Sequence, residues 1–178
     1  MGMRKHKITL YFRLGVTMSK KVFSLLVDNQ AGVLSRVSGL FSRRGYNIDS
    51  LTVGVTEDCQ RSRMTIVTSG EPEILEQIEK QLAKLVDVVE IRVLPADAAV
   101  CRELIIVKVA ATAETRQQIM SIAEIFRAKI VDVAQESLML ELTGHDRKLQ
   151  AFIDMLEPYG VLELARTGIT GLARGETK

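Results

Sequence analysis

Residues 28–50 read DNQAGVLSRVSGLFSRRGYNIDS and place a polar loop, an apolar-striped segment and a glycine-containing turn in immediate succession. The apolar side chains recur at intervals that put them on one face of a helix: Val33, Leu34, Val37, Leu40 and Phe41. Gly45 stands where a helix commonly ends in the left-handed conformation, and Arg43 and Arg44 before it complement the negative end of the helix dipole. The stretch therefore predicts a helix that begins after a polar loop and ends at Gly45.

Strand patterns surround this helix on both sides. The short apolar run 22–27 precedes it, and residues 48–56 and 64–68 alternate as a hairpin with one polar side. A second helix opens at 71–73, where proline and acidic residues suit a first turn, and the run 86–94 is a fourth strand. The order β-α-β-β-α-β predicts a four-stranded antiparallel sheet with two helices on one face.

The second half of the chain repeats this order. The predicted elements are strand 104–109, helix 114–127, strands 130–133 and 138–142, a helix over 149–156, and strand 161–165. We therefore expect an α+β protein with two ferredoxin-like βαββαβ sandwiches in tandem, at 22–95 and 100–171, joined by the linker 96–99. The tail after residue 171, which includes 172–178, is expected to fray.

The first 21 residues differ in charge from the rest. Residues 1–21 carry six basic residues and no acidic one, so the remaining sequence holds 18 basic against 22 acidic residues. This basic extension is expected to be flexible. It fits a transit-like segment, a flexible arm or an upstream extension of the reading frame with Met18 as the initiator, and the last interpretation is preferred because patterned sequence begins only at Val22.

Composition favours a soluble cytoplasmic protein. Cys59 and Cys101 lie far apart and belong to no CxxC motif or Cys/His cluster, so they are expected to be reduced thiols. The apolar segment 8–16 is short and interrupted by Arg13, which does not suit a membrane span. Aromatic residues make up only 4% of the chain, so few side chains could stack on bases and we expect no nucleic-acid partner.

The sequence carries no recognisable catalytic or metal-binding motif. His6 and His145 are each isolated from other metal-type ligands, and no nucleophile elbow, P-loop or dinucleotide fingerprint is present. A general base at His145 is conceivable because Asp146 follows it, but a solvent-facing residue at a helix start is the preferred interpretation. We expect no catalytic residue and no metal ligand in this chain.

The loop before the first helix suits a small zwitterion. The first N–H groups of a helix lack partners within it and favour a carboxylate. Gly32 allows close approach, and the Asn29 amide group can accept from an ammonium group and donate to a carboxylate. The same residues also fit a structural role, in which Asn29 or Asp28 caps the helix and Gly32 relieves a tight turn.

Asn47 is the corresponding polar residue at the far end of the helix. It lies just before the next strand, where an exposed side chain could reach across to the loop of a second subunit. A turn asparagine with no ligand is the structural alternative.

Several long blocks resemble the small, regulatory subunit of acetolactate synthase (acetohydroxyacid synthase). Besides DNQAGVLSRVSGLFSRRGYNIDSLTVG at the start, they are SRMTIVTSG, LEQIEKQLAKLVDVVEI, RELIIVKV, EIFRAKIVDV and ARTGITGLARG. The resemblance extends over residues 22–175 and leaves the basic extension outside it.

The resemblance implies an N-terminal ACT domain for effector binding and dimerisation, followed by a C-terminal ferredoxin-like domain. It implies a homodimer that activates the thiamine-diphosphate-dependent catalytic subunit and confers feedback inhibition by valine, or another branched-chain amino acid, in branched-chain amino acid biosynthesis. Thiamine diphosphate, magnesium and FAD are then expected on the catalytic subunit and no cofactor on this chain.

In such a dimer, the effector lies between paired ACT domains. The matching positions are Asn29, Gly32, Val33 and Leu34 from one subunit with Asn47 and Ile48 from the other. The alternative is a free-standing ACT-domain amino-acid sensor that controls another enzyme or transcription. This alternative predicts no stable complex with the catalytic subunit and a basic or helical DNA-binding module in the chain, and no such module is visible after residue 21.

Overall fold

The computed structural model describes residues 19–175. What the sequence predicted for residues 1–18 and 176–178 lies outside the described part. The first strand, β1, spans Ser19–Asp28 and so begins before Val22, where the apolar pattern had placed its start. Polar residues at its beginning concealed this boundary, because the backbone pairing of Ser19 with Gly70 does not depend on side-chain type.

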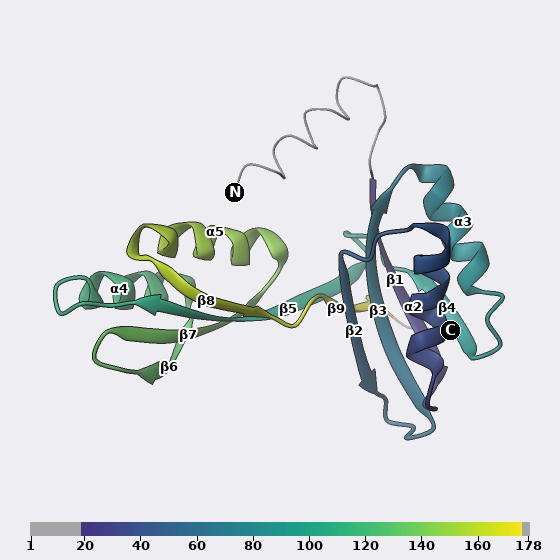
Figure 1. The fold of residues 1–178 in the computed structure, drawn as a ribbon, viewed down its shortest axis with the longest axis horizontal. Helices are drawn as coiled ribbons and strands as arrows, with labels where there is room; N and C mark the ends of the chain where they lie inside the picture. The colour runs from purple at the N-terminus through teal and green to yellow at the C-terminus, as the bar shows by residue number, and fades with distance from the viewer. Residues whose placement is uncertain (1–18, 176–178) are drawn as a thin grey trace. The chain divides into compact units, whose positions relative to one another are not determined.

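The first half of the chain forms the predicted βαββαβ unit (Figure 1). Its elements are β1 (Ser19–Asp28), α2 (Val33–Arg44), β2 (Ser50–Val55), β3 (Arg61–Gly70), α3 (Pro72–Leu82) and β4 (Val88–Val93). The antiparallel sheet has the order β2-β3-β1-β4, so β2 and β4 are its edges. This confirms the predicted fold of the unit.

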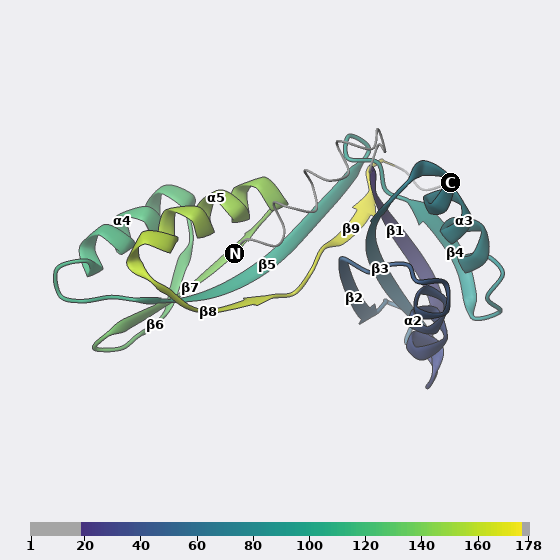
Figure 2. The same cartoon turned by 45° about the horizontal axis from the view of Figure 1, so that its top comes forward.

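Both helices of this unit cover one face of the sheet, as Figures 1 and 2 show. Alternate residues of the central strand β1, Phe23, Leu25 and Val27, are fully buried beneath them. The helix α2 adds the buried residues Val33, Val37, Leu40 and Phe41. It ends at Gly45, which is left-handed (φ 68°) and donates its backbone N–H to the carbonyls at the end of the helix.

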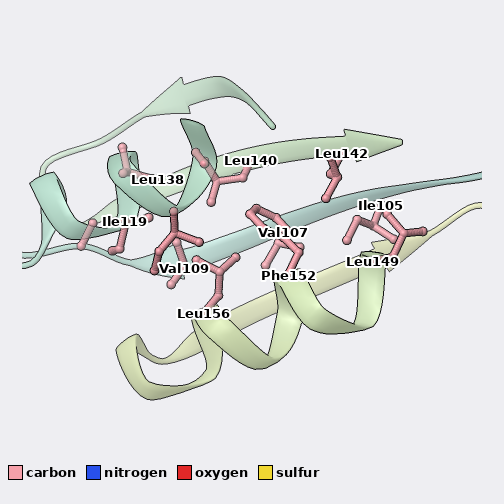
Figure 3. Close-up of a cluster of buried hydrophobic side chains, with 13 residues drawn as sticks. Ile105, Val107, Val109, Ile119, Leu138, Leu140, Leu142, Leu149, Phe152 and Leu156 are labelled. Carbon is pink, nitrogen blue, oxygen red and sulfur yellow. The ribbon is translucent and has the colours of Figure 1, made fainter. Parts of the chain in front are cut away.

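The second half repeats the order with its own core. Its elements are β5 (Ala99–Ala110), α4 (Arg116–Phe126), β6 (Lys129–Val133), β7 (Ser137–Gly144), α5 (Asp146–Leu156), a short 3-10 turn η1 (Glu157–Tyr159) and β8 (Val161–Arg166). The sheet order β6-β7-β5-β8 matches that of the first unit. Figure 3 shows the core, where Ile105, Val107 and Val109 of β5 face the buried side of α5, which carries Leu149, Phe152 and Leu156.

A further strand was not foreseen from the sequence. β9 (Thr170–Ala173) pairs with β5, and the Arg174 N–H donates to the Ala98 carbonyl at 2.8 Å, although this part of the chain was expected to fray (Figure 2). The described residues divide into two compact units. One runs to Val100 and resumes at Gly171, and the other spans Cys101–Thr170.

No helix in the described range 19–175 is long and apolar enough to cross a membrane.

Candidate functional site

The loop between β1 and α2 brings a glycine in a left-handed conformation to the start of the helix. Gly32 is the N-terminal cap residue with φ 85°, and its carbonyl accepts the N–H of Arg36 at 2.9 Å. No side chain caps α2. The structural alternative in which Asn29 or Asp28 caps this helix is therefore wrong, because the Asn29 side chain binds the hairpin between β2 and β3 and the Asp28 carboxylate pairs with Arg61.

The first turn of α2 has backbone N–H groups that are available to bind a ligand. The Val33 N–H makes one long bond to the Gln30 carbonyl at 3.4 Å, and the N–H groups of Leu34 and Ser35 have no backbone acceptor within residues 19–175. Such groups, together with the helix dipole, favour an anion at this end. The Val33 side chain is buried in the core, so this residue can serve a ligand only through its backbone. Leu34 is 45% exposed and its side chain can reach one.

Asn29 ties the loop to the hairpin between β2 and β3. Its Nδ2 donates to the Cys59 carbonyl at 2.9 Å, and its Oδ1 accepts from the Ser62 hydroxyl at 3.0 Å. Its backbone N–H donates to the Gln60 carbonyl at 2.8 Å. An asparagine amide group has two N–H donors and two acceptor lone pairs, so one of each remains for a ligand. The residue can hold the loop and still contact a zwitterion.

A residue that the sequence reasoning missed lies behind the loop. Asp87, in the turn between α3 and β4, is buried, and its carboxylate accepts two hydrogen bonds from Arg36, from Nε at 2.7 Å and Nη2 at 2.8 Å. The Arg36 guanidinium holds the pKa of Asp87 below its usual range. An acidic residue inside the apolar run LVDVVE was the available signal, since buried carboxylates are almost always paired.

The far end of α2 carries the other predicted residues. Asn47 is exposed, its Nδ2 donates to Asp49 Oδ1 at 2.6 Å, and its carbonyl accepts from the Thr68 hydroxyl at 2.6 Å. Ile48 is half-buried and packs against the core of the unit. These contacts fix Asn47 and Ile48 in the turn just before β2.

One chain does not bring the two groups of predicted residues together. Gly32 and Asn47 lie at opposite ends of a helix of 12 residues, which is about 18 Å long. A free amino acid cannot span that distance. A pocket that uses both groups therefore requires a second copy of the chain.

The remaining chemistry-bearing residues form no centre in the part of the chain that the structure covers. No group of three or more His, Cys, Asp or Glu side chains there could hold a metal ion. His145 is the N-terminal cap of α5, and its Nδ1 accepts the Lys148 N–H at 3.2 Å. This structural role explains the position of His145 without any catalytic one.

Family models match both halves of the chain. The model described as "AHAS small subunit-like ACT domain" matches residues 23–90, and the one described as "Small subunit of acetolactate synthase" matches residues 102–175. The chain belongs to the family of acetolactate synthase small subunits. This confirms the resemblance noted in the sequence, and it supports a regulatory, non-catalytic subunit over a free-standing sensor.

Individual relatives cover nearly the same span. The acetolactate synthase small subunit of Mycolicibacterium smegmatis is 53% identical over 152 residues, covering 85% of this chain and 89% of the relative. That of Bacillus subtilis is 45% identical and covers 88% and 91% of the two chains. The crystal structure of the small subunit from Thermotoga maritima superposes with a TM-score of 0.82 at 42% identity and covers 89% of this chain and 99% of that one.

Proposed function

We propose that this small subunit binds the thiamine-diphosphate-dependent catalytic subunit of acetolactate synthase, raises its activity and makes it inhibitable by valine. The observation that carries the proposal is the match of both halves of the chain to the small-subunit family. Thiamine diphosphate, magnesium and FAD are assigned to the catalytic subunit. The cytoplasm is the compartment that suits the two free cysteines, Cys59 and Cys101.

The valine pocket in this proposal lies between two ACT domains. One copy supplies the donors of the α2 start and the Asn29 amide group, and the other supplies Asn47 and Ile48. The carboxylate meets the helix start, the ammonium group meets an asparagine oxygen, and the side chain meets Leu34 and Ile48. One methylene changes affinity by only about 1–3 kcal/mol, so leucine and isoleucine are expected to bind as weaker or comparable effectors.

The edge strand β2 supports a side-by-side homodimer. Val53 is opposite Met64 on β3, and cross-strand partners face the same side of a sheet, so Val53 lies on the helix-covered face. Val55 follows on the same side. These two valines are nevertheless 46% and 62% exposed, and β2 has no further strand beyond it within its sheet. A second copy at this edge would cover them and would satisfy an unprotected strand edge.

The decisive experiment mixes the purified chain with an acetolactate synthase catalytic subunit and measures acetolactate formation from pyruvate with and without valine. We expect the chain to raise the activity and valine to lower it toward the level of the catalytic subunit alone. A chain that leaves both the activity and its valine response unchanged would contradict the proposed function.

The pocket itself is tested by calorimetry with valine on Asn29→Ala and Gly32→Asp variants. Both should weaken valine binding by at least about fivefold, the lower end of usual coupling between sites, since one removes the amide group and the other places a carboxylate at the anion site. Ser62→Ala is the matched control, because it removes a hydrogen bond to Asn29 but leaves its amide group present. Unchanged affinity in both pocket variants would remove this site.

The dimer is tested by sedimentation of a Val55→Glu variant in the presence of valine. A charge on the helix-covered face of β2 should shift the chain to a monomer and abolish valine binding. Val89→Glu is the control, because Val89 is 52% exposed on the other edge strand, β4. If Val89→Glu dissociates the dimer and Val55→Glu does not, the pairing edge is β4.

A further inference from the structure

We infer that Asp87 is a positioning residue for the effector loop and acts on it through Arg36. This inference rests on the proposed function, because it concerns how the valine site is held in shape. Asp87 was not among the predicted site residues. It lies in the turn that follows α3, on the opposite side of the loop from the hairpin that holds Asn29.

Asp87 contacts the chain on both sides of the loop. Its backbone carbonyl accepts the N–H of Asp28, where the loop begins, at 3.0 Å. Its carboxylate holds Arg36, in the first turns of α2 after the loop has ended, through two hydrogen bonds of 2.7 and 2.8 Å. One buried residue therefore fixes the separation between the end of β1 and the start of α2.

The Arg36 guanidinium carries this contact to Gly32. A Cβ atom built on Gly32 would lie 3.0 Å from Arg36 Nη1, so this nitrogen stands directly against the glycine. A guanidinium is planar, and once Asp87 holds Nε and Nη2, the position of Nη1 is determined as well. The Arg36 side chain is half exposed, and the two hydrogen bonds that hold it are both to the Asp87 carboxylate. Asp87 thus holds the Arg36 guanidinium beside Gly32, at the helix start that would receive the effector carboxylate.

A second ion pair in the chain provides a control that distinguishes this positioning role from a purely stabilising one. Arg166 donates to Glu103 through Nε at 2.9 Å and Nη2 at 2.6 Å. The side-chain exposure of Glu103 is 6% and that of Asp87 is 10%, so the two carboxylates are similarly buried. The Glu103–Arg166 pair belongs to the other unit, Cys101–Thr170, and touches no residue of the effector loop. Its loss should affect stability alone.

The experiment titrates the full-length chain with valine by calorimetry and follows thermal unfolding of the same samples. Asp87→Asn keeps the shape and the backbone carbonyl but removes the charge, and Arg36→Met removes the guanidinium. Each should weaken valine binding at least fivefold, and the double variant should bind no worse than either single one, because the two residues act as one unit. Arg36→Lys should stay weak, since an ammonium group cannot replace the two parallel hydrogen bonds.

Glu103→Gln is the matched control. It should lower the unfolding temperature about as much as Asp87→Asn does, and it should leave the affinity for valine within twofold of the wild-type value. If the wild type binds valine and Asp87→Asn and Arg36→Met bind it with the same affinity, this inference is overturned and the proposed function stays intact. Equal weakening by Glu103→Gln would also overturn it, because the effect would then follow stability. If Asp87→Asn does not fold, the valine affinity of Arg36→Met tests the inference instead, because the Arg36 side chain is half exposed. A wild-type chain that does not bind valine at all would overturn the proposed effector function and this inference together.

Discussion

Gly32 precedes α2 and Gly39 lies within it, and the two glycines are under different conformational constraints. Gly32 has a positive φ and Arg36 beside it, whereas a Cβ on Gly39 would meet nothing within 4 Å. Gly32→Ala should therefore lower the free energy of unfolding by about 1 kcal/mol or more. Gly39→Ala should raise it by about 0.5–1 kcal/mol, because alanine is the better helix former. Urea denaturation measures both, and changes of the same sign would show that φ does not govern Gly32.

Asp87 also makes stability depend on pH. Its pKa in the folded chain lies below the value of about 3.9 expected in the unfolded chain, chiefly because of the hydrogen bonds from Arg36. Its stabilising contribution is present in full above that value and is lost as pH falls toward the folded-state pKa. The difference in unfolding free energy between wild type and Asp87→Asn should be largest above about pH 5 and shrink below about pH 4. Urea titrations at several pH values measure it, and a constant difference would contradict the assignment.

At the scale of elements, the helices that follow the first strand of each unit end in the same left-handed conformation but at different residue types. α2 ends at Gly45 and α4 ends at Arg127, and both residues are left-handed, with φ of 68° and 58°. Arg127 is the one non-glycine residue with positive φ in the described part of the chain. Left-handed backbone is unfavourable for a residue with a Cβ, so Arg127 keeps the same cap geometry at some expense in stability.

Arg127→Gly should accordingly stabilise the second unit. Relief of the left-handed conformation is worth about 1–2 kcal/mol, and the greater freedom of glycine in the unfolded chain offsets about 0.5–1 kcal/mol of it. A net gain of about 0.5–1 kcal/mol is expected in chemical denaturation. Arg127→Lys, which keeps both the charge and the Cβ, is the control and should change little. A loss of stability in Arg127→Gly would mean that the arginine side chain contributes more than the backbone strain removes.

At the scale of the whole molecule, residues 19–175 form two separate hydrophobic cores. Phe41 fills one and Phe152 the other, and both side chains are almost fully buried. Substitution of either by alanine should lower the stability of its own unit by about 3–5 kcal/mol. Only Phe41→Ala should weaken valine binding, because the effector loop belongs to the first core. Calorimetric unfolding together with valine titration measures this, and loss of binding in Phe152→Ala would show that the second unit takes part in the site.

Much of this organisation could be predicted from the sequence, because its causes are local. The 3.6-residue period of α2, the alternation along β1 and the glycine at position 45 each follow from the chemistry of neighbouring residues. Both βαββαβ units could therefore be named before any tertiary contact was known. The loop of residues 28–32 was also recognisable as a helix start suited to an anion.

The tertiary structure alone decided which side chains hold that loop. Asn29 could not be separated from a helix cap by sequence, because only the hairpin 30 residues further along the chain supplies Cys59 and Ser62 as its partners. Asp87 lies 51 positions from Arg36, and Arg174, next to β9, lies 76 positions from its partner Ala98, so neither contact leaves a local pattern. The periodicity of the sequence reflects which face of each element is buried, whereas pairing between distant elements depends on the tertiary fold of the chain.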